Sequence, residues 1–392
     1  MEKRIFGLPR NIFFLGLTSF LNDFSSEMVF SVFPAFFTSV LKAGAGALGL
    51  VDGVAEASSN LFKIYSGHLS DRFQKRKPLV VSGYMLSVLT RPFYSLTSTV
   101  GGALGLRFLD RVGKGMRDAP RDAIISLSTP KEELGRSFGY HRAMDTTGAI
   151  LGPLAAFLLL TYFPLRFDMV FMTAFAVGIL AVISLIFIKD VAGIAASRRL
   201  SLMGSFRNLS PEFKRYLLTM FMLSVGTLPV VVLLLKTESI GLSIANIPLF
   251  YMVYSISYAA FAFYAGKTSD RVGARRVIFI GYLVLLGSYA VLNAAHSALM
   301  LGFGFLVMGL FPALTDGVQR ALASRLVSEE LRGAGLGWLS AVNGFGALAA
   351  GVSGGYLWQV YGSPTAFLAA SGVIIIGLLF FLFFFSPRKT LA

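Results

Sequence analysis

The sequence GHLSDRFQKRK at residues 67–77 returns about 199 residues later as GKTSDRVGARR at residues 266–276. Each copy follows an apolar stretch long enough to cross a membrane, and each ends in a group of basic residues. A weaker echo at a similar distance pairs residues 118–121 with residues 316–320. These repeats predict that the chain consists of two related halves built to the same plan.

The composition places most of the 392-residue chain in lipid. Hydrophobic residues make up 55% of it and charged residues 14%, and the mean hydropathy is +0.71. A soluble core cannot bury that much apolar surface. Each membrane crossing takes about 20 apolar residues plus a short connection, so about twelve crossings fit. We predict spans at residues 11–38, 46–69, 79–97, 100–127, 136–160, 168–188, 213–236, 245–266, 276–294, 297–325, 333–359 and 364–385.

The longest connection, Lys189–Pro211, lies almost at the middle of the chain and is rich in Ser, Gly, Ala and Arg. We therefore predict an all-α membrane protein of twelve transmembrane helices in two pseudo-symmetric six-helix bundles. The bundles are residues 1–190 and residues 212–392, and residues 191–211 form a cytoplasmic linker. Parallel six-helix repeats of this kind are a known transporter plan.

The basic residues predict the orientation in the membrane. The net charge is +15, and about 20 of the Lys and Arg residues near the helix ends lie in alternate loops and the two tails, against about two, Lys42 and Arg166, on the other side. We predict a multi-pass protein of the cell inner membrane with both termini cytoplasmic. The charge is a topology signal in short loops, so nucleic acid is not an expected partner.

Several kinds of chemistry find no support in the sequence. The chain has no cysteine and three scattered histidines, so we expect no disulfide, no thiolate nucleophile and no metal site. No phosphate-binding G-x-x-x-x-G-K motif occurs, which points to an ion gradient as the energy source. A membrane enzyme or a receptor is the alternative from another class, but neither a reactive constellation nor a large external loop is present. We predict that the protein is not an enzyme.

The repeated loops resemble the loop motif of the major facilitator superfamily, and the resemblance covers nearly the whole chain. It includes the two copies, with Gln74 and Lys75 replacing the usual Gly and Arg. The resemblance implies the fold of that superfamily and transport by alternating access. It assigns conformational gating to Gly67, Asp71, Arg72 and Arg76 in the first copy and to Asp270, Arg271 and Arg275 in the second.

The predicted fifth helix carries Gly148, Gly152 and Pro153. This sequence is similar to the motif that the superfamily's antiporters carry, with alanines in place of its trailing glycines. The resemblance implies export and adds the three residues to the gating set. Small residues four apart also allow close helix packing in any membrane protein, which is the alternative interpretation.

The predicted fourth helix is the most charged span and resembles a modified R-x-x-Q-G-x-G motif of the superfamily. Arg111 and Gly115 match, and Lys114 stands in the Gln position. Charges in a span are costly and are kept where they pair or line a water-filled path. Helical spacing predicts that Asp110 pairs with Lys114 and Asp118 with Arg121. The candidates for proton coupling and the substrate cavity on this helix are Arg107, Asp110, Arg111 and Lys114.

The excess of basic groups on the fourth helix needs partners on other helices. We expect them among Asp23 and Glu27 in the first span, Asp52 and Glu56 in the second, and Asp145 in the fifth. The members of the first two pairs are four residues apart, so each pair projects from one helical face. These carboxylates are candidates for proton coupling because a neighbouring Arg can reset their protonation. The alternative is a structural ion-pair network.

The second half is poor in charge. Tyr251, Tyr254 and Tyr258 fall on one face of a predicted helix and could form an aromatic wall for a substrate, although packing or lipid contact is the alternative. Asp316 and Arg320, with Gln319 between them, form the strongly polar cluster of this half. We expect that cluster to act in a gate between the halves.

These observations predict a secondary active transporter that moves a small-molecule solute by alternating access, with the coupling site at mid-membrane. The partial antiporter motif favours proton-coupled efflux by antiport. Uptake by symport, uniport, and export of a metal or metal chelate are the alternatives. The expected partners are the solute, protons and the lipid bilayer. We expect no cofactor, with the proton gradient as the energy source, and a monomer.

Overall fold

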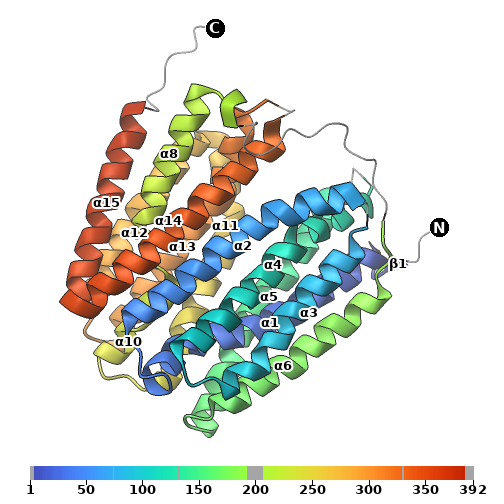
Figure 1. The fold of residues 1–392 in the computed structure, drawn as a ribbon. Helices are drawn as coiled ribbons and strands as arrows, with labels where there is room; N and C mark the ends of the chain where they lie inside the picture. The colour runs from blue at the N-terminus through green and yellow to red at the C-terminus, as the bar shows by residue number, and fades with distance from the viewer. Residues whose placement is uncertain (1–3, 74, 131–132, 192–205, 329–330, 385–392) are drawn as a thin grey trace. The chain divides into compact units, whose positions relative to one another are not determined.

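The computed structural model describes residues 4–73, 75–130, 133–191, 206–328 and 331–384 (Figure 1). At residues 68, 71–73 and 384 it describes the backbone alone. Within these ranges the chain is almost wholly helical. The strands there are β1 (Arg4–Ile5) and β2 (Leu8–Pro9), which pair antiparallel with Ile5 opposite Leu8.

The first six long helices correspond in order to the first six predicted spans. They are α1 (Arg10–Ser39), α2 (Ala45–Phe73), α3 (Lys77–Phe93), α4 (Val100–Leu127), α5 (Leu134–Tyr162) and α6 (Phe167–Ser184). One 3-10 turn follows α3 and another follows α6: η1 (Tyr94–Leu96) and η3 (Leu185–Phe187).

The second half continues the same plan. Its helices are α8 (Pro211–Val225), α9 (Val230–Leu234), α10 (Lys236–Ser239), α11 (Ile247–Val272), α12 (Ala274–Asn293), α13 (Ala298–Leu326), α14 (Arg332–Tyr361) and α15 (Ser363–Phe384), with the 3-10 turn η4 (Ile244–Asn246) before α11. Across the described chain, eight helical segments are long and apolar enough to cross a membrane, and they correspond to the predicted spans five to twelve. The more polar helices α1 to α4 occupy the first four, so the chain is an all-α membrane protein consistent with twelve spans.

The predicted span at residues 213–236 corresponds to the apolar segment Pro211–Leu234, within which the helix is interrupted between α8 and α9. The interruption runs from Gly226 to Pro229, and proline cannot donate a backbone hydrogen bond. The buried hydroxyl of Tyr289 on α12 satisfies the freed groups: it accepts from Leu228 N at 2.7 Å and donates to Gly226 O at 3.1 Å. Hydropathy does not reveal such a break, since the residues on both sides are apolar.

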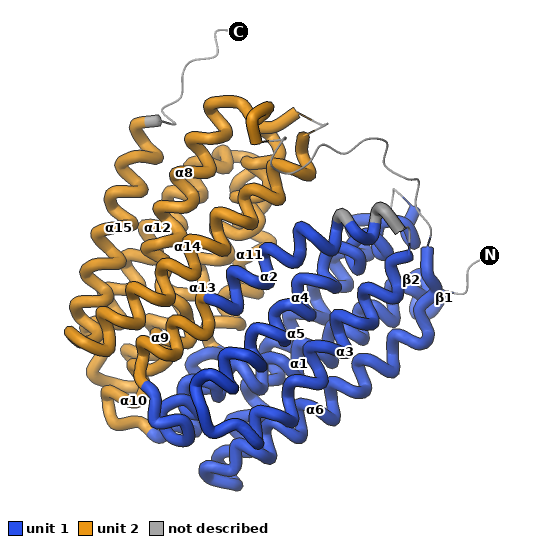
Figure 2. The backbone as a smooth tube through the Cα atoms, viewed as in Figure 1, with its two compact units in different colours: residues 1–43, 54–199, 243–252 blue, residues 44–53, 200–242, 253–392 orange. Residues whose placement is uncertain are grey.

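Two compact units can be distinguished (Figure 2). Unit 1 contains residues 1–43, 54–199 and 243–252, and unit 2 contains residues 44–53, 200–242 and 253–392. Helices α2 and α11 therefore contribute to both units. Residues 192–205, which make up most of the predicted linker, lie outside the described residues, and the predicted domain boundaries stay a prediction.

Close packing in unit 1 depends on glycines that face neighbouring backbones. A Cβ atom added to Gly152 on α5 would lie within 3.0 Å of the carbonyl oxygen of Phe24 on α1. Gly148, one turn earlier, is packed as tightly against Phe20 on α1. The predicted small-residue contact is thus observed, and it holds α1 against α5. Its role in gating stays a prediction.

Candidate functional site

Helix α4 supplies the charged residues of the candidate site. Its first turn is capped by Thr99, whose side chain accepts from Gly102 N at 3.1 Å. Arg107 and Arg111 follow four residues apart, so they share one face. Both are buried, while Lys114 on the next turn is half-buried. A membrane helix keeps such charges only where other groups of the protein compensate them.

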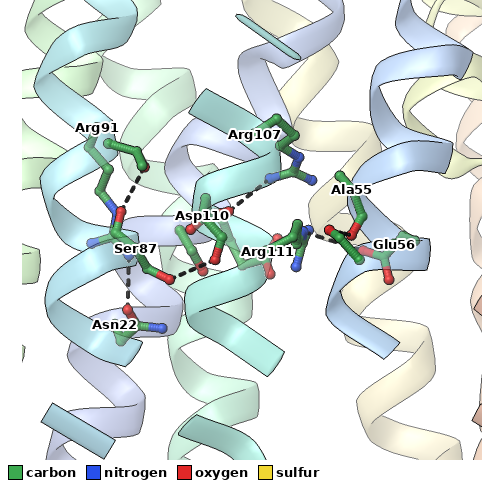
Figure 3. Close-up of polar contacts among 12 residues, drawn as sticks. Asn22, Ala55, Glu56, Ser87, Arg91, Arg107, Asp110 and Arg111 are labelled. Carbon is green, nitrogen blue, oxygen red and sulfur yellow. Dashed lines mark hydrogen bonds and ion pairs between the residues drawn. The ribbon is translucent and has the colours of Figure 1, made fainter. Parts of the chain in front are cut away.

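The arginines of α4 form ion pairs within the helix and with α2 (Figure 3). Arg107 Nη1 lies 3.4 Å from Asp110 Oδ2, and Arg111 Nε lies 3.4 Å from Glu56 Oε1 on α2. The predicted pair of Asp110 with Lys114 is therefore wrong. Asp110 instead pairs one turn toward the N-terminus, and Lys114 forms no ion pair among the described residues.

The C-terminal part of α4 carries a second set of ion pairs. The predicted pair of Asp118 with Arg121 is confirmed, with 3.8 Å between Oδ1 and Nη1. Asp118 also lies 3.5 Å from Lys63 Nζ on α2, and Arg121 lies 3.0 Å from Asp122. Sequence analysis did not predict Lys63 as a partner, since it lies on another helix with no fixed spacing to Asp118.

Aromatic rings surround the guanidinium of Arg107. Its Cζ atom lies 4.8 Å from the ring centre of Phe30 and 5.4 Å from that of Phe33, both on α1. The same Phe30 ring lies 5.8 Å from Arg111 Cζ and 5.0 Å from the ring centre of Tyr251. Cation–π contacts of this kind partly offset the desolvation of a buried arginine.

The two carboxylates of α1 bind neutral groups. Asp23 Oδ1 accepts from Asn22 Nδ2 at 3.1 Å, and Glu27 Oε2 accepts from the hydroxyl of Tyr251 at 2.8 Å. In the part of the chain that the structure describes, neither forms an ion pair. The charge of Lys114 nevertheless acts on both carboxylates. Direct pairing with the α4 arginines is thus seen for Glu56 and is not seen for Asp23 or Glu27.

Asp145 lies on α5 close to the acids of α1. The hydroxyl of Ser19 on α1 donates to its carboxylate, and His141 Nδ1 lies 3.8 Å from its Oδ2. The charge of Asp145 acts on Asp23. Asp145 therefore joins the polar cluster of unit 1, whereas Asp52 is buried on the part of α2 that belongs to unit 2.

Sequence analysis missed two buried arginines. Arg91 on α3 is 2% exposed and donates to Asn22 Oδ1. Arg117 on α4 donates to Ser87 Oγ at 2.8 Å, and its Cζ lies 4.4 Å from the ring centre of Tyr84. A single arginine inside a predicted apolar span was the signal for Arg91, since such residues are functional candidates by default.

The first copy of the repeated loop contacts the segment that follows η3. The backbone N–H groups of Arg76 and Lys77 donate to Asp190 Oδ1 at 3.2 and 3.1 Å, which caps the start of α3. The side chains of Asp71 and Arg72 lie outside the described residues. Gly67 has ordinary space around it, because an added Cβ would meet the nearest neighbour at 3.4 Å. The gating role of Gly67 stays a prediction.

The second copy forms exposed ion pairs in unit 2. Asp270 Oδ1 lies 3.1 Å from Arg325 Nη2, and Arg275 Nη2 lies 2.9 Å from Glu212 Oε1. Arg271 is exposed in the last turn of α11. Exposed pairs of this type contribute about 1 kcal/mol or less to stability. The gating role of this loop stays a prediction.

The remaining candidates lie on α11 and α13. Tyr251 is buried and belongs to unit 1, and Tyr254 and Tyr258 are half-buried in unit 2. The hydroxyl of Tyr258 lies 3.3 Å from Asp316 Oδ2, and Arg320 is exposed. The aromatic wall and the gate stay predictions.

A family model described as Major Facilitator Superfamily matches residues 15–202 and 215–392. The chain belongs to this superfamily. It is 36% identical over 382 residues to an uncharacterized MFS-type transporter of Methanocaldococcus jannaschii, covering 95% of this chain and 94% of that protein. It is 24% identical over 380 residues to the multidrug resistance protein MdtG of Klebsiella pneumoniae, covering 93% of this chain and 91% of that one.

The fold also agrees with that of a solved transporter. The crystal structure of the nucleoside transporter NupG is similar with a TM-score of 0.78 and 15% sequence identity, covering 96% of this chain and 99% of that one. At that identity the likeness shows the fold alone. The family match and the relative of Methanocaldococcus jannaschii show that this superfamily member is a multi-pass membrane transporter and not an enzyme, as the sequence predicted.

Proposed function

We propose that this transporter exports a small organic solute across the inner membrane in exchange for protons, by alternating access. The observation that carries the proposal is the burial of Asp23 and Glu27 and the partners that they bind. Both carboxylates are half-buried on α1 and bind neutral donors, and both lie in the field of Lys114 without an ion pair to it among the described residues. Carboxylates in such a setting can take up a proton or release it.

The proposed coupling step uses the basic face of α4. Two carboxylates four residues apart repel each other, so a proton binds when the cations of α4 are distant. When Lys114 and Arg111 approach, the cations replace the proton as the partner of the carboxylates and the proton leaves. Arg111 already has Glu56 as a partner, so its approach to Glu27 would exchange one carboxylate for another. The charge on the site is then linked to the conformation of α4.

The direction of transport rests on two supports. Gly148, in the part of α5 that resembles the antiporter motif, packs directly on Asp23, since an added Cβ would lie 3.2 Å from the Asp23 Cβ. A change in the packing of α5 would therefore reach the proposed proton site. The name of the related MdtG protein, a multidrug resistance protein, also supports efflux of organic solutes.

The experiment that tests this function is flux in reconstituted vesicles. The purified protein is placed in liposomes with a trapped pH indicator, and a panel of small organic solutes is added with and without an imposed proton gradient. We expect at least one solute to move against its own gradient and to drive a counterflow of protons. Solute movement that ignores the proton gradient would instead show a uniporter, and proton movement in the same direction as the solute would show a symporter.

In the described ranges, no group of three or more His, Asp or Glu side chains lies close enough together to hold a metal ion.

The proposed orientation can be tested by single-cysteine labelling, because the natural chain contains no cysteine. Lys42 lies after α1 and Arg207 before α8, and both are exposed. With both termini cytoplasmic, we expect an impermeant maleimide to label the Lys42→Cys variant from outside intact cells, and the Arg207→Cys variant after lysis alone. Labelling of position 42 from the inner side would show that the topology is inverted.

A further inference from the structure

Arg91 lies in the interior of unit 1, where α3 meets α1 and α6. It is among the largest fully buried side chains of the described chain. The structure places no carboxylate of the described residues within ion-pair distance of it. Burying a guanidinium costs free energy unless its N–H groups are hydrogen-bonded and its charge is compensated by neighbouring groups.

Each end of the Arg91 guanidinium is bound to a neutral acceptor. Nη1 donates to Ser25 Oγ, and the Ser25 hydroxyl in turn donates to the carbonyl oxygen of Ala174 on α6. Nη2 donates to Asn22 Oδ1 at 2.9 Å (Figure 3). Gly178 on α6 leaves the space that the guanidinium fills, because a Cβ atom there would overlap Arg91 Nη1. Three helices therefore hold this arginine in one position.

The arginine also fixes the orientation of Asn22. An arginine has donors and no acceptor, so it selects the amide oxygen of Asn22 and turns the amide nitrogen away. That nitrogen donates to Asp23 Oδ1 at 3.1 Å. Asn22 is fully buried, so water cannot replace either bond. The three residues form a chain of hydrogen bonds from the cation, through the polarised amide, to the carboxylate.

We propose that Arg91 is a positioning residue for Asp23: acting through Asn22, it presents a hydrogen-bond donor that favours the ionised carboxylate and so sets the pH at which Asp23 exchanges its proton. This inference rests on the proposed proton coupling. Among the described residues, the hydrogen bonds of Arg91 run from α3 to α1, and through Ser25 to α6, and include no atom of α4. Arg91 therefore supplies a bias of its own, to which the cations of α4 add a conformation-dependent one.

Other charged groups act on Asp23 from each neighbouring helix. They are Lys114, Arg117 and Arg121 on α4, Asp145 on α5 and Glu27 on α1 itself, and the charge of Asp23 acts in turn on Arg91. The acids oppose ionisation of Asp23 and the bases favour it. Loss of the Asn22 donor should therefore move the protonation of Asp23 and should not abolish it.

The test measures protonation directly and needs no substrate. Infrared difference spectra of the purified full-length protein are recorded across pH, and the carbonyl band of a protonated carboxyl group is assigned to Asp23 by its loss in the Asp23→Asn variant. In Asn22→Leu, and in Arg91→Gln, we expect the midpoint of this band to move to higher pH by about one unit, a tenfold change in proton affinity.

The matched control is Ser184→Ala. Ser184 on α6 forms a buried hydrogen bond with Thr18 on α1. Its loss weakens the contact between α1 and α6 but leaves the hydrogen bonds from Arg91 through Asn22 to Asp23 in place. We expect an unchanged midpoint in this variant. Thermal unfolding of each variant confirms that it is folded, and Asn22→Leu serves if Arg91→Gln does not fold.

Two results would overturn the inference, and they can be told apart. If Asp23→Asn removes no titrating band, Asp23 does not exchange a proton, and the proposed coupling fails together with the role of Arg91. If the band is present but its midpoint in Asn22→Leu matches that of the natural protein and of Ser184→Ala, proton exchange stands and Arg91 has a structural role alone.

Discussion

Replacing Glu27 by glutamine, or Asp23 by asparagine, is expected to abolish gradient-driven accumulation of the solute while downhill exchange stays measurable. An amide has nearly the shape of the acid but cannot bind or release a proton at physiological pH. The hydrogen bond from Tyr251 to Glu27 and that from Asn22 to Asp23 can both be retained by the amide oxygen. The fold should therefore survive, and the step that links charge to conformation should not.

The measurement compares two assays on the same vesicles. Uphill uptake into inverted vesicles under an imposed proton gradient reports coupling, and exchange of labelled against unlabelled solute without a gradient reports binding and alternating access. Asp168→Asn is a suitable control, because this carboxylate forms an exposed pair with Arg166 and has no proposed part in coupling. If both amide variants still drive uphill transport with a normal pH dependence, the coupling group must be Asp52, Glu56, Asp110 or Asp145.

The sequence predicted which residues are charged in the membrane, but it predicted their partners less well. Spacing along one helix favoured Lys114 for Asp110, whereas Asp110 contacts Arg107. Both choices are sterically open on an isolated helix, so neighbouring helices decide between them. A Cβ atom at Gly115 would lie within 3.0 Å of Ser59 O on α2. This close approach of α2 and α4 accompanies the pairing of Glu56 with Arg111, and no sequence spacing encodes it.

Neutral partners were harder to predict than charged ones. Asn22 and Tyr251 bind the acids of α1, yet neither stands out by charge. Tyr251 was noticed for the aromatic face of its helix, while its contact with Glu27 spans about 224 positions of sequence. Hydropathy and charge patterns therefore located the spans and the charged helix, and the contacts that define each carboxylate required the packed structure.

Substitution of Gly152 by alanine adds one methyl group, and we expect it to destabilise unit 1 more than the same substitution at the other glycines discussed above. The added Cβ would overlap the carbonyl oxygen of Phe24 and lie 3.1 Å from Met28 N, both backbone atoms of α1. A backbone atom cannot move aside as a flexible side chain can, so α1 and α5 must separate. Overpacking of this kind costs about 1 to 3 kcal/mol, and it also displaces Asp23 relative to α5.

Gly139 provides the matched control, because it lies on the same helix and an added Cβ there meets no atom within 4 Å. Alanine is the better helix former by about 1 kcal/mol, so Gly139→Ala should leave thermal stability unchanged or raise it. We expect Gly152→Ala to lower the unfolding temperature of the purified protein. An unchanged unfolding temperature in that variant would show that α1 and α5 are not held as closely as described. The two substitutions are thus expected to change the unfolding temperature in opposite directions, although both glycines lie on α5. This difference separates the effect of helix packing from that of helix propensity.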